Sequence, residues 1–428
     1  MPHQPTVVLP SQLNQWLHPE FQLCFGGGWE IQMSNYGWTY LSRDALRRAE
    51  RQLSGAGEGV RDEIGFLIIH QRYADYFFPG TSVLHTRLRY ALFVPWIYQT
   101  LYEQGPTPRA GDSLQKAEVR LAGRLKFGGG RGVIGGLNYP KPTSQPPSVS
   151  YWAALGTWGI LKQQDGRLPS RAYLHNLLQS KHRKAVDDDG QALSITELPF
   201  AALPPQPKDW SGNDPMQFDL LPREAQFLYG QFADLRPLRS PKQLSLLARL
   251  TANGAVEADD CWAPGIVELA KEDGPKLRRA GHAASLAAVG RAIYAVLVEK
   301  LQEEEEHLPN SGRHRNYLPV VIEEHGATAS QTSVSDLLMD TGPIPPAVTE
   351  VLEQTVAWLR KGAKNPMVLR EAYEYAECNR KQQRARLSRL YGASRRLDWK
   401  NEEHALATPL HYRWGQVSGL LHDLWAAA

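Results

Sequence analysis

One short motif in the chain has the residue types of a phosphodiesterase. His182, Lys184 and Asp189 match the His-x-Lys-x-x-x-x-Asp spacing of phospholipase D-type enzymes. In that chemistry a histidine is the nucleophile and a lysine holds the phosphate. Those enzymes need two copies of the motif in each active site, and this sequence contains one. The single copy also follows a predicted helix and runs into an acidic linker, so the sequence argues against this activity.

The possible metal ligands are scattered along the chain. The thirteen histidines include no His-x-x-x-His pair, which would place two imidazoles on one face of a helix. The three cysteines, Cys24, Cys261 and Cys378, are too far apart to form a metal-binding knuckle and imply no disulfide framework. We therefore expect no catalytic residue, no metal and no cofactor. A metal-dependent nuclease is the least favoured of the functions considered.

A glycine-rich segment, residues 127–136, has the composition of a phosphate-binding loop. Such a loop needs a Gly-Lys-Ser/Thr sequence that opens a helix after a strand, and this segment has neither feature. Pro140 follows closely and forbids a helix there. The segment is predicted to be a flexible connector. Arg124, Lys126 and Arg131 around it are candidates for contact with a phosphate backbone.

The strongest charge signal is a basic segment near the C-terminus. Residues 360–400 hold twelve Lys or Arg and four acids, a balance of +8, in a chain whose net charge is +3. If about five of these cations meet phosphates, the logarithm of affinity falls with log salt at a slope of roughly −4 to −5. Alternatives are an acidic protein partner, or a solvated face paired with the upstream Glu374 and Glu377. The candidate nucleic-acid ligands here are Arg380, Lys381, Arg384, Arg386, Arg389, Arg395 and Arg396.

The elements that must position these residues are almost all predicted to be helices. Apolar residues recur at helical spacing, and strand-like alternation is scarce, with residues 317–322 as the best candidate. Pro79-Gly80 is expected to end one helix, Thr81 or Ser82 to cap the next, and Pro95 to kink or end it. Predicted helices cover residues 42–53, 64–78, 82–95, 112–125, 170–178, 222–233, 241–253, 265–271, 276–306, 347–361, 365–391 and 404–425.

The fold class that follows is mainly α, with several domains. We predict an N-terminal helical domain over residues 1–140, a helix-turn-helix or winged-helix module as an option over 148–190, and a helical domain over 213–428. The helix with Ala283 to Leu301 is expected to be the buried centre of the last domain, because its many small residues allow close approach. It is judged too short and too polar to span a membrane. The N-terminus lacks the pattern of a signal peptide, so a cytoplasmic location is expected.

The segment FFPGTSVLHTRLRYALFVPWIY, residues 77–98, closely resembles the hallmark of an uncharacterised bacterial family of unknown function. We call it the FPGTS segment. Members of that family run "FPGTST…TRARYFLFVPWI", and further matches include Gly132 to Gly135 and Tyr412 to Gly415. The resemblance implies a place in bacterial genome-defence neighbourhoods, beside helicases and nucleases. It assigns no chemistry to any residue. Within the segment and just before it, Arg72, His85, Arg87 and Arg89 remain as candidates for an external ligand.

These observations favour a non-catalytic subunit of a bacterial anti-phage or DNA-modification-linked defence system. It is expected to bind nucleic acid, with DNA favoured, or to bridge it to partner proteins such as a helicase or nuclease. The alternative is a protein–protein scaffold of such a complex that has no contact with nucleic acid. The twelve Trp and seventeen Tyr would then line protein interfaces.

Overall fold

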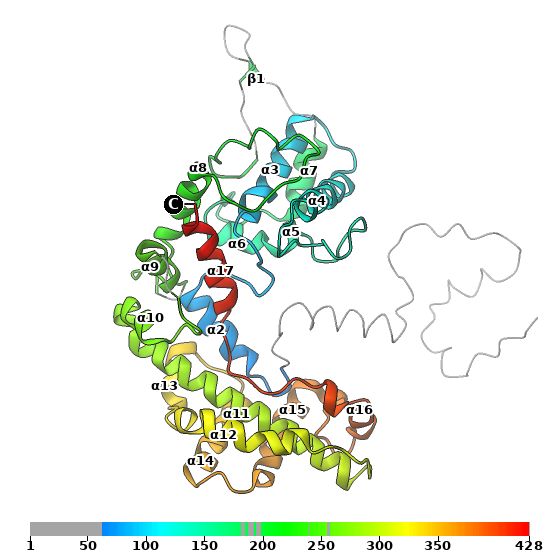
Figure 1. Ribbon diagram of the computed structural model, residues 1–428, viewed down its shortest axis with the longest axis vertical. Helices are drawn as coiled ribbons and strands as arrows, with labels where there is room; N and C mark the ends of the chain where they lie inside the picture. The colour runs from blue at the N-terminus through cyan, green and yellow to red at the C-terminus, as the bar shows by residue number, and fades with distance from the viewer. Residues whose placement is uncertain are drawn as a thin grey trace, which may run out of the picture. The chain divides into compact units, whose positions relative to one another are not determined.

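The computed structural model describes residues 62–180, 185–186, 192–193, 198–238, 240–254 and 257–427. The chain divides into two units, Met1–Gly59 and Val60–Ala428, and every described residue lies in the second, whose described helices Figure 1 shows in colour. The predicted helix over residues 42–53, the motif residues His182, Lys184 and Asp189, and Cys24 lie outside the described residues. The domain boundaries predicted near residues 140, 190 and 213 fall within the second unit and remain predictions.

The second unit is mainly α, as predicted. Its described residues form sixteen α-helices and one two-stranded antiparallel sheet. The α-helices are α2 Leu67–Phe77, α3 Tyr90–Glu103, α4 Ala110–Phe127, α5 Pro147–Ser150, α6 Trp152–Thr157, α7 Arg171–Gln179, α8 Pro222–Ala233, α9 Leu246–Asn253, α10 Pro264–Leu269, α11 Gly274–Glu304, α12 Arg313–Ser330, α13 Val334–Thr341, α14 Pro346–Arg360, α15 Arg370–Lys381, α16 Ala393–Leu397 and α17 Trp414–Trp425. The strands are β1 Ala185–Val186 and β2 Ala192–Leu193, and short 3-10 turns lie at η2 Lys271–Asp273, η3 Pro366–Leu369, η4 Gln382–Arg384 and η5 Asn401–Glu403.

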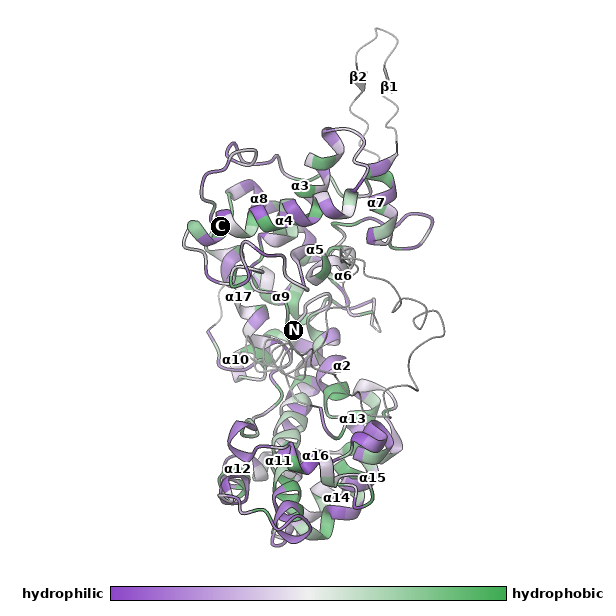
Figure 2. Ribbon diagram, turned by 90° about the vertical axis from the view of Figure 1, so that its right-hand side faces the viewer, coloured by the Kyte–Doolittle hydropathy of each residue, from purple (hydrophilic) through white to green (hydrophobic). Residues whose placement is uncertain are grey.

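Helix α11 is the buried centre of the helices that surround it, as predicted. Its small residues let large rings approach its backbone: a Cβ added at Gly290 would lie 2.5 Å from Cζ of Phe66. At 31 residues it has the predicted length, but the prediction that it is too short and too polar to span a membrane was wrong, because by length and composition it could cross one. However, 89% of its most apolar stretch of 18 residues is buried inside the protein, as in a core helix. Figure 2 shows its largely apolar colouring.

The FPGTS segment differs from the prediction after its Pro-Gly turn. Residues 81–89 form turns instead of a helix, because Thr81 Oγ1 donates to Phe78 O and the Ser82 amide donates to Nδ1 of His85. Helix α3 starts only at Tyr90 and continues through Pro95 to Glu103. An interior proline costs a helix about 3 kcal/mol. Burial of nearly every side chain from Tyr90 to Tyr98 offsets that cost.

Three further predictions were wrong, one because of a distant contact and two because the backbone turns out of the helical conformation. The expected strand at 317–322 lies inside α12, whose first turn is held by the carboxylate of Glu299, 2.8 Å from the amides of His314 and Arg315. The expected single helix over 365–391 ends at Lys381, because Gln382 has a φ of +50°. The expected helix from residue 404 begins only at Trp414, after two residues of positive φ, Tyr412 and Arg413.

The segment proposed as a helix-turn-helix module contains α6 and α7, separated by residues 158–170. The Oγ of Ser170 caps α7 by accepting from the Tyr173 amide, as the sequence predicted. A helix-turn-helix motif joins its helices by a turn of three or four residues. The connection here is longer, and α7 packs against α4.

Candidate nucleic-acid interface

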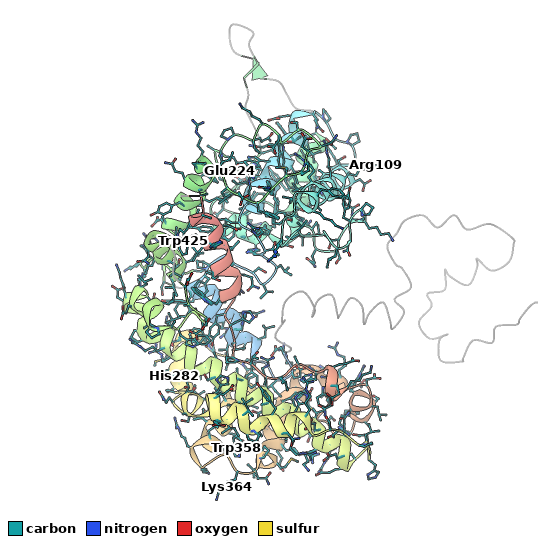
Figure 3. All side chains as sticks on the ribbon, viewed as in Figure 1. Arg109, Glu224, His282, Trp358, Lys364 and Trp425 are labelled. Atoms are coloured by element: carbon teal, nitrogen blue, oxygen red, sulfur yellow. The ribbon has the colours of Figure 1, made fainter. Side chains whose placement is uncertain are left out.

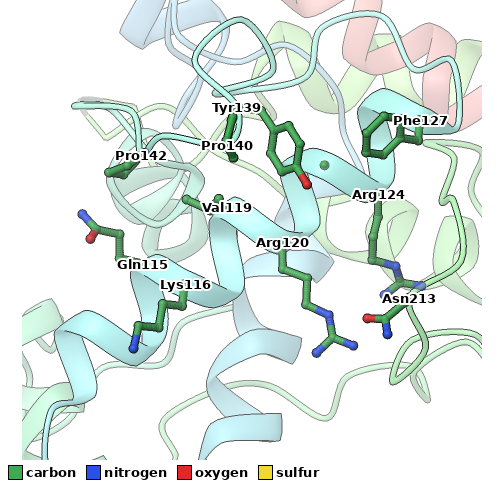
Figure 4. A pocket seen from close by; sticks show the side chains of 11 residues that line it. Gln115, Lys116, Val119, Arg120, Arg124, Phe127, Tyr139, Pro140, Pro142 and Asn213 are labelled. Carbon is green, nitrogen blue, oxygen red and sulfur yellow. The ribbon is translucent and has the colours of Figure 1, made fainter.

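A groove runs along α4 and combines cations with aromatic rings. Lys116, Arg120 and Arg124 recur every four residues, so helical geometry places them in one row on α4. The cavity has a volume of about 480 Å³, and its lining includes three cations and no carboxylate (Figure 4). The lining residues are Gln115, Lys116, Val119, Arg120, Gly123, Arg124, Phe127, Tyr139, Pro140, Pro142 and Asn213.

The two arginines of the row also hold the opposite wall of the groove. Arg124 donates to the carbonyl oxygens of Asp209, Trp210 and Asp214 at 2.6–2.8 Å. Burial lowers the pKa of this guanidinium, and the nearby Asp209 opposes that effect. Arg120 donates to the carbonyl of Gly212 at 3.0 Å. Both arginines therefore fix the chain over residues 209–214 against α4, and only Arg120 stays exposed.

The lysines around the groove are more available. Lys116 and Lys126 are exposed on α4, and Lys141 is exposed on the segment that follows Tyr139. Within the described part of the chain none of the three has an ion-pair partner, although Nζ of Lys126 lies 5.9 Å from the centroid of the Tyr139 ring. Lys141 lines a smaller hollow that shares Tyr139 and Pro142 with the groove. The same edge of the molecule thus presents three unpaired ammonium groups.

The glycine-rich segment beside the groove is held in place by the FPGTS segment. Thr86 Oγ1 donates to Gly132 O at 2.7 Å, and the Ile134 amide donates to the hydroxyl of Tyr90 at 2.9 Å. The second contact uses a backbone amide that a phosphate cradle would need free. Arg131 is exposed on this segment. The interpretation as a connector therefore fits the structure, with Arg131 as its one cation.

The two arginines of the FPGTS segment are committed to ion pairs inside the protein. Arg87 Nε lies 2.9 Å from both carboxylate oxygens of Asp423 on α17. Arg89 lies 2.8 Å from Oε1 of Glu224 on α8, with exposed side-chain fractions of 7% and 1%. Figure 3 labels Glu224 on this helix. Each pair joins segments far apart in the sequence. Arg87 and Arg89 therefore hold α8 and α17 to the start of α3 and leave little to offer a ligand.

His85 and Arg72 are also used internally. The Ser82 amide donates to Nδ1 of His85, so its Nε2 carries the proton and donates to Ser150 O at 3.1 Å. Burial lowers the pKa of His85 to about 4, so the ring is neutral at pH 7. Arg72 donates to the carbonyls of Thr341, Gly342 and Pro343. These residues stabilise the fold.

Comparison with known proteins agrees with the resemblance at the level of the family. Residues 33–321 match a family described as a family of unknown function (DUF6361). The chain belongs to this family. No curated protein and no solved structure matches the chain significantly. The part of the chain that matches DUF6361 contains the FPGTS segment and every residue that lines the groove, and it ends before the basic segment of residues 360–400.

Of the seven candidate nucleic-acid ligands in the basic segment, five are paired with acids of the described unit. Arg396 is fully buried and binds Glu306 in a bidentate pair at 2.6 and 2.7 Å. Arg386 and Lys381 approach Glu63 at 3.3 and 3.7 Å, and Lys381 also lies 3.6 Å from Glu377. Arg380 pairs with Asp62, and Arg389 lies 3.5 Å from Glu305. Pairing with Glu377 agrees with the alternative that the sequence left open.

The other two candidates, Arg384 and Arg395, are exposed and have no ion-pair partner within the described residues. Beside them in the sequence, large apolar side chains are also exposed: Leu390 by 84%, Tyr391 by 56% and Leu397 by 58%. We call residues 384–397 the C-terminal patch segment. Its composition combines free positive charge with uncovered apolar surface.

Among the described residues, no group of three or more His, Cys, Asp or Glu side chains lies close enough to hold a metal ion. The sequence analysis did not predict that Lys116, Arg120, Phe127 and Tyr139 belong to one site. The four-residue spacing from Lys116 to Arg124 could have revealed the row of cations. No sequence signal shows that Tyr139 folds back onto α4.

Proposed function

We propose that this protein is a non-catalytic nucleic-acid-binding or bridging subunit of a bacterial anti-phage or DNA-modification-linked defence system, and that the groove along α4 is its nucleic-acid contact. The observation that carries the proposal is the composition of the groove, whose lining has three cations and no carboxylate. Backbone phosphates supply most of the affinity in nucleic-acid binding, and they need positive charge that is not already neutralised. The groove has such charge, while five of the seven candidate ligands of the basic segment are paired with acids.

The family context supports the rest of the proposal. The FPGTS segment resembles a family whose members occur beside helicases and nucleases, so such enzymes are the expected partners and a cytoplasmic location is expected. DNA is favoured as the ligand for the same reason. The groove lies within residues 33–321, the range that matches the family.

The test is a salt-titrated binding assay with a labelled DNA oligonucleotide. Lys116, Lys126 and Lys141 would be changed together to Glu, because none has an ion-pair partner in the described part of the chain. Three phosphate contacts correspond to a slope of about −2 to −3 in log affinity against log salt. The triple variant should bind at least tenfold more weakly at low salt, and its slope should be smaller by about 2.

The matched control changes Lys162, Lys242 and Lys364 to Glu, three exposed lysines outside the groove, with the same change in net charge. The control should keep wild-type affinity within about twofold. Absence of binding by the wild-type protein, or an equal loss in the two triple variants, would remove the groove as the contact.

The C-terminal patch segment favours a second candidate function, the protein scaffold. Its free Arg384 and Arg395 and its exposed Leu390 and Tyr391 fit an acidic partner segment that carries apolar side chains. Changing Leu390 and Tyr391 to Asp should abolish co-purification with neighbouring gene products from the native operon after nuclease treatment. Met339→Asp, at a side chain that is 76% exposed, is the control and should leave co-purification intact.

A further inference from the structure

The groove contains two aromatic rings that its cations alone do not explain. Phe127, the last residue of α4, is 67% exposed, and Tyr139 is partly exposed beside it. Their ring centroids are 5.8 Å apart and the planes are nearly perpendicular, at 88°. Both rings line the cavity (Figure 4). An apolar ring makes no favourable contact with a phosphate. This aromatic pair therefore indicates a contact with a different part of the ligand.

The position of Tyr139 is determined by the helix beneath it. A Cβ added at Gly123 would lie 2.5 Å from Cε2 of Tyr139 and 2.7 Å from Cζ, so the ring fits only because residue 123 is glycine. The Phe127 ring lies edge to face with it, and Lys126 Nζ lies 5.9 Å from its centroid. The ring is therefore already held in the groove before any ligand arrives, which reduces the ordering cost of binding.

We propose that the groove binds single-stranded nucleic acid, with an unpaired base stacked on the aromatic pair Tyr139 and Phe127 and the adjacent phosphates on Lys116, Lys126 and Lys141. This inference rests on the proposed nucleic-acid binding and specifies its substrate. Every base has a flat π-face, so rings beside a positively charged groove bind single strands with little sequence preference. In a duplex both faces of each base are covered by its neighbours, and the bases cannot reach a ring that lies inside a groove.

The division of roles makes the inference testable. Loss of a stacking ring weakens single-strand binding by about tenfold, within the range known for base–aromatic stacking. It leaves the dependence on salt unchanged, because no phosphate contact is lost. Loss of a lysine changes both affinity and salt slope. A duplex contacts the lysines only, so its affinity does not depend on the rings.

The experiment uses the full chain and three probes of one sequence: a 20-nucleotide DNA single strand, its duplex, and the RNA single strand. The wild type should bind a single strand about tenfold more tightly than the duplex, and either polymer supports the inference. Tyr139→Leu and Phe127→Leu should each remove about tenfold for the single strand and nothing for the duplex. Fluorescence of 2-aminopurine placed in the strand should be quenched by the wild type and not by Tyr139→Leu.

The matched control is Tyr229→Leu, at a tyrosine on α8 that is 43% exposed and lies outside the groove. It should bind as the wild type does, and thermal unfolding of all variants should confirm that they fold. Equal wild-type affinity for single strand and duplex, or unchanged binding and quenching in Tyr139→Leu, would overturn the inference while the proposed function stands. Absence of binding to all three probes would remove both.

Discussion

The ring of Tyr139 lies against the backbone of Gly123 in the middle of α4, with no room for a side chain between them. Glycine is a poor choice for a helix interior, where it costs about 1 kcal/mol relative to alanine. At this position the cost is offset by a contact that no other residue type permits. The glycine at position 123 of α4 therefore determines the position of the Tyr139 ring, and with it the shape of the groove.

Gly123→Ala should therefore weaken nucleic-acid binding without destabilising the protein strongly. The new methyl group gains helix propensity but pushes the Tyr139 ring away, and we expect single-strand affinity to fall about five- to tenfold. Fluorescence anisotropy measures the affinity, and thermal unfolding measures the stability. Gly230→Ala on α8 is the control, because a Cβ there meets no atom within 4 Å. The control should gain up to about 1 kcal/mol and bind normally. Normal binding by Gly123→Ala would contradict the role given to Tyr139.

Helices with local start signals could be predicted from the sequence, and elements determined by distant contacts could not. Pro222 at the first position of α8 and Ser170 as the cap of α7 made those helices predictable at the correct residues. The start of α12 depends instead on Glu299, which reaches the amide of His314 from another helix. Residues 317–322 were the best strand candidate in the sequence, because nothing local reveals that contact.

The same distinction applies to the candidate site. Arg124, Lys126 and Arg131 were predicted as phosphate contacts because they lie close together in the sequence. Of these three, only Arg124 lines the groove, and Tyr139 lies beside it there through its contact with Gly123. The sequence shows that residues 360–400 are rich in cations. It does not show that Arg396 pairs with Glu306, because the two residues are 90 positions apart. Composition counts charges and does not show which of them are already neutralised.

The ion pair between Arg89 and Glu224 should be essential for stability. Both side chains are almost fully buried, and Glu224 also accepts from the Leu221 amide at 3.1 Å. Arg89→Met leaves a buried carboxylate without its partner, which costs about 3–5 kcal/mol. Urea unfolding measures the loss. Arg223→Met, at an exposed residue on the same helix, should cost less than about 0.5 kcal/mol.

Adding Glu224→Gln to Arg89→Met should restore part of that stability. The neutral amide removes the unpaired charge, and its oxygen still accepts from the Leu221 amide. A loss below about 1 kcal/mol in Arg89→Met alone would show that the pair does not hold α8 to α3.

His85 should make the protein less stable as the pH falls below neutral. Its pKa is lowered by burial to about 4, against about 6.5 in the unfolded chain. Between these values the unfolded chain binds a proton that the folded chain excludes, so the free energy of unfolding decreases as pH falls. The contribution is complete above pH 6.5, and about 2 kcal/mol of it should be lost by pH 5.

The measurement compares urea unfolding at pH 7.5 and pH 5. His85→Phe keeps the ring contact with Tyr151, whose centroid is 4.2 Å away, and removes the titrating group. It should be less stable than the wild type at pH 7.5, since two hydrogen bonds are lost, but should fall by about 2 kcal/mol less on going to pH 5. His422→Phe, at an exposed histidine on α17, should retain the wild-type pH dependence. An unchanged dependence in His85→Phe would contradict this assignment.

Reversing the free charges of the C-terminal patch segment separates the two candidate surfaces. Arg384 and Arg395 are exposed and unpaired within the described residues, so Glu at both positions should not disturb the fold. If nucleic acid binds in the α4 groove, this double variant should keep DNA affinity within about twofold and lose co-purification with partner proteins. The lysine variants of the groove should show the opposite pattern. Arg380 and Arg389 are unsuitable for this test, because each pairs with an internal acid and its reversal would place two carboxylates together. A tenfold loss of DNA affinity in the double variant would show that nucleic acid binds the basic segment, as its charge balance predicts, and not the α4 groove.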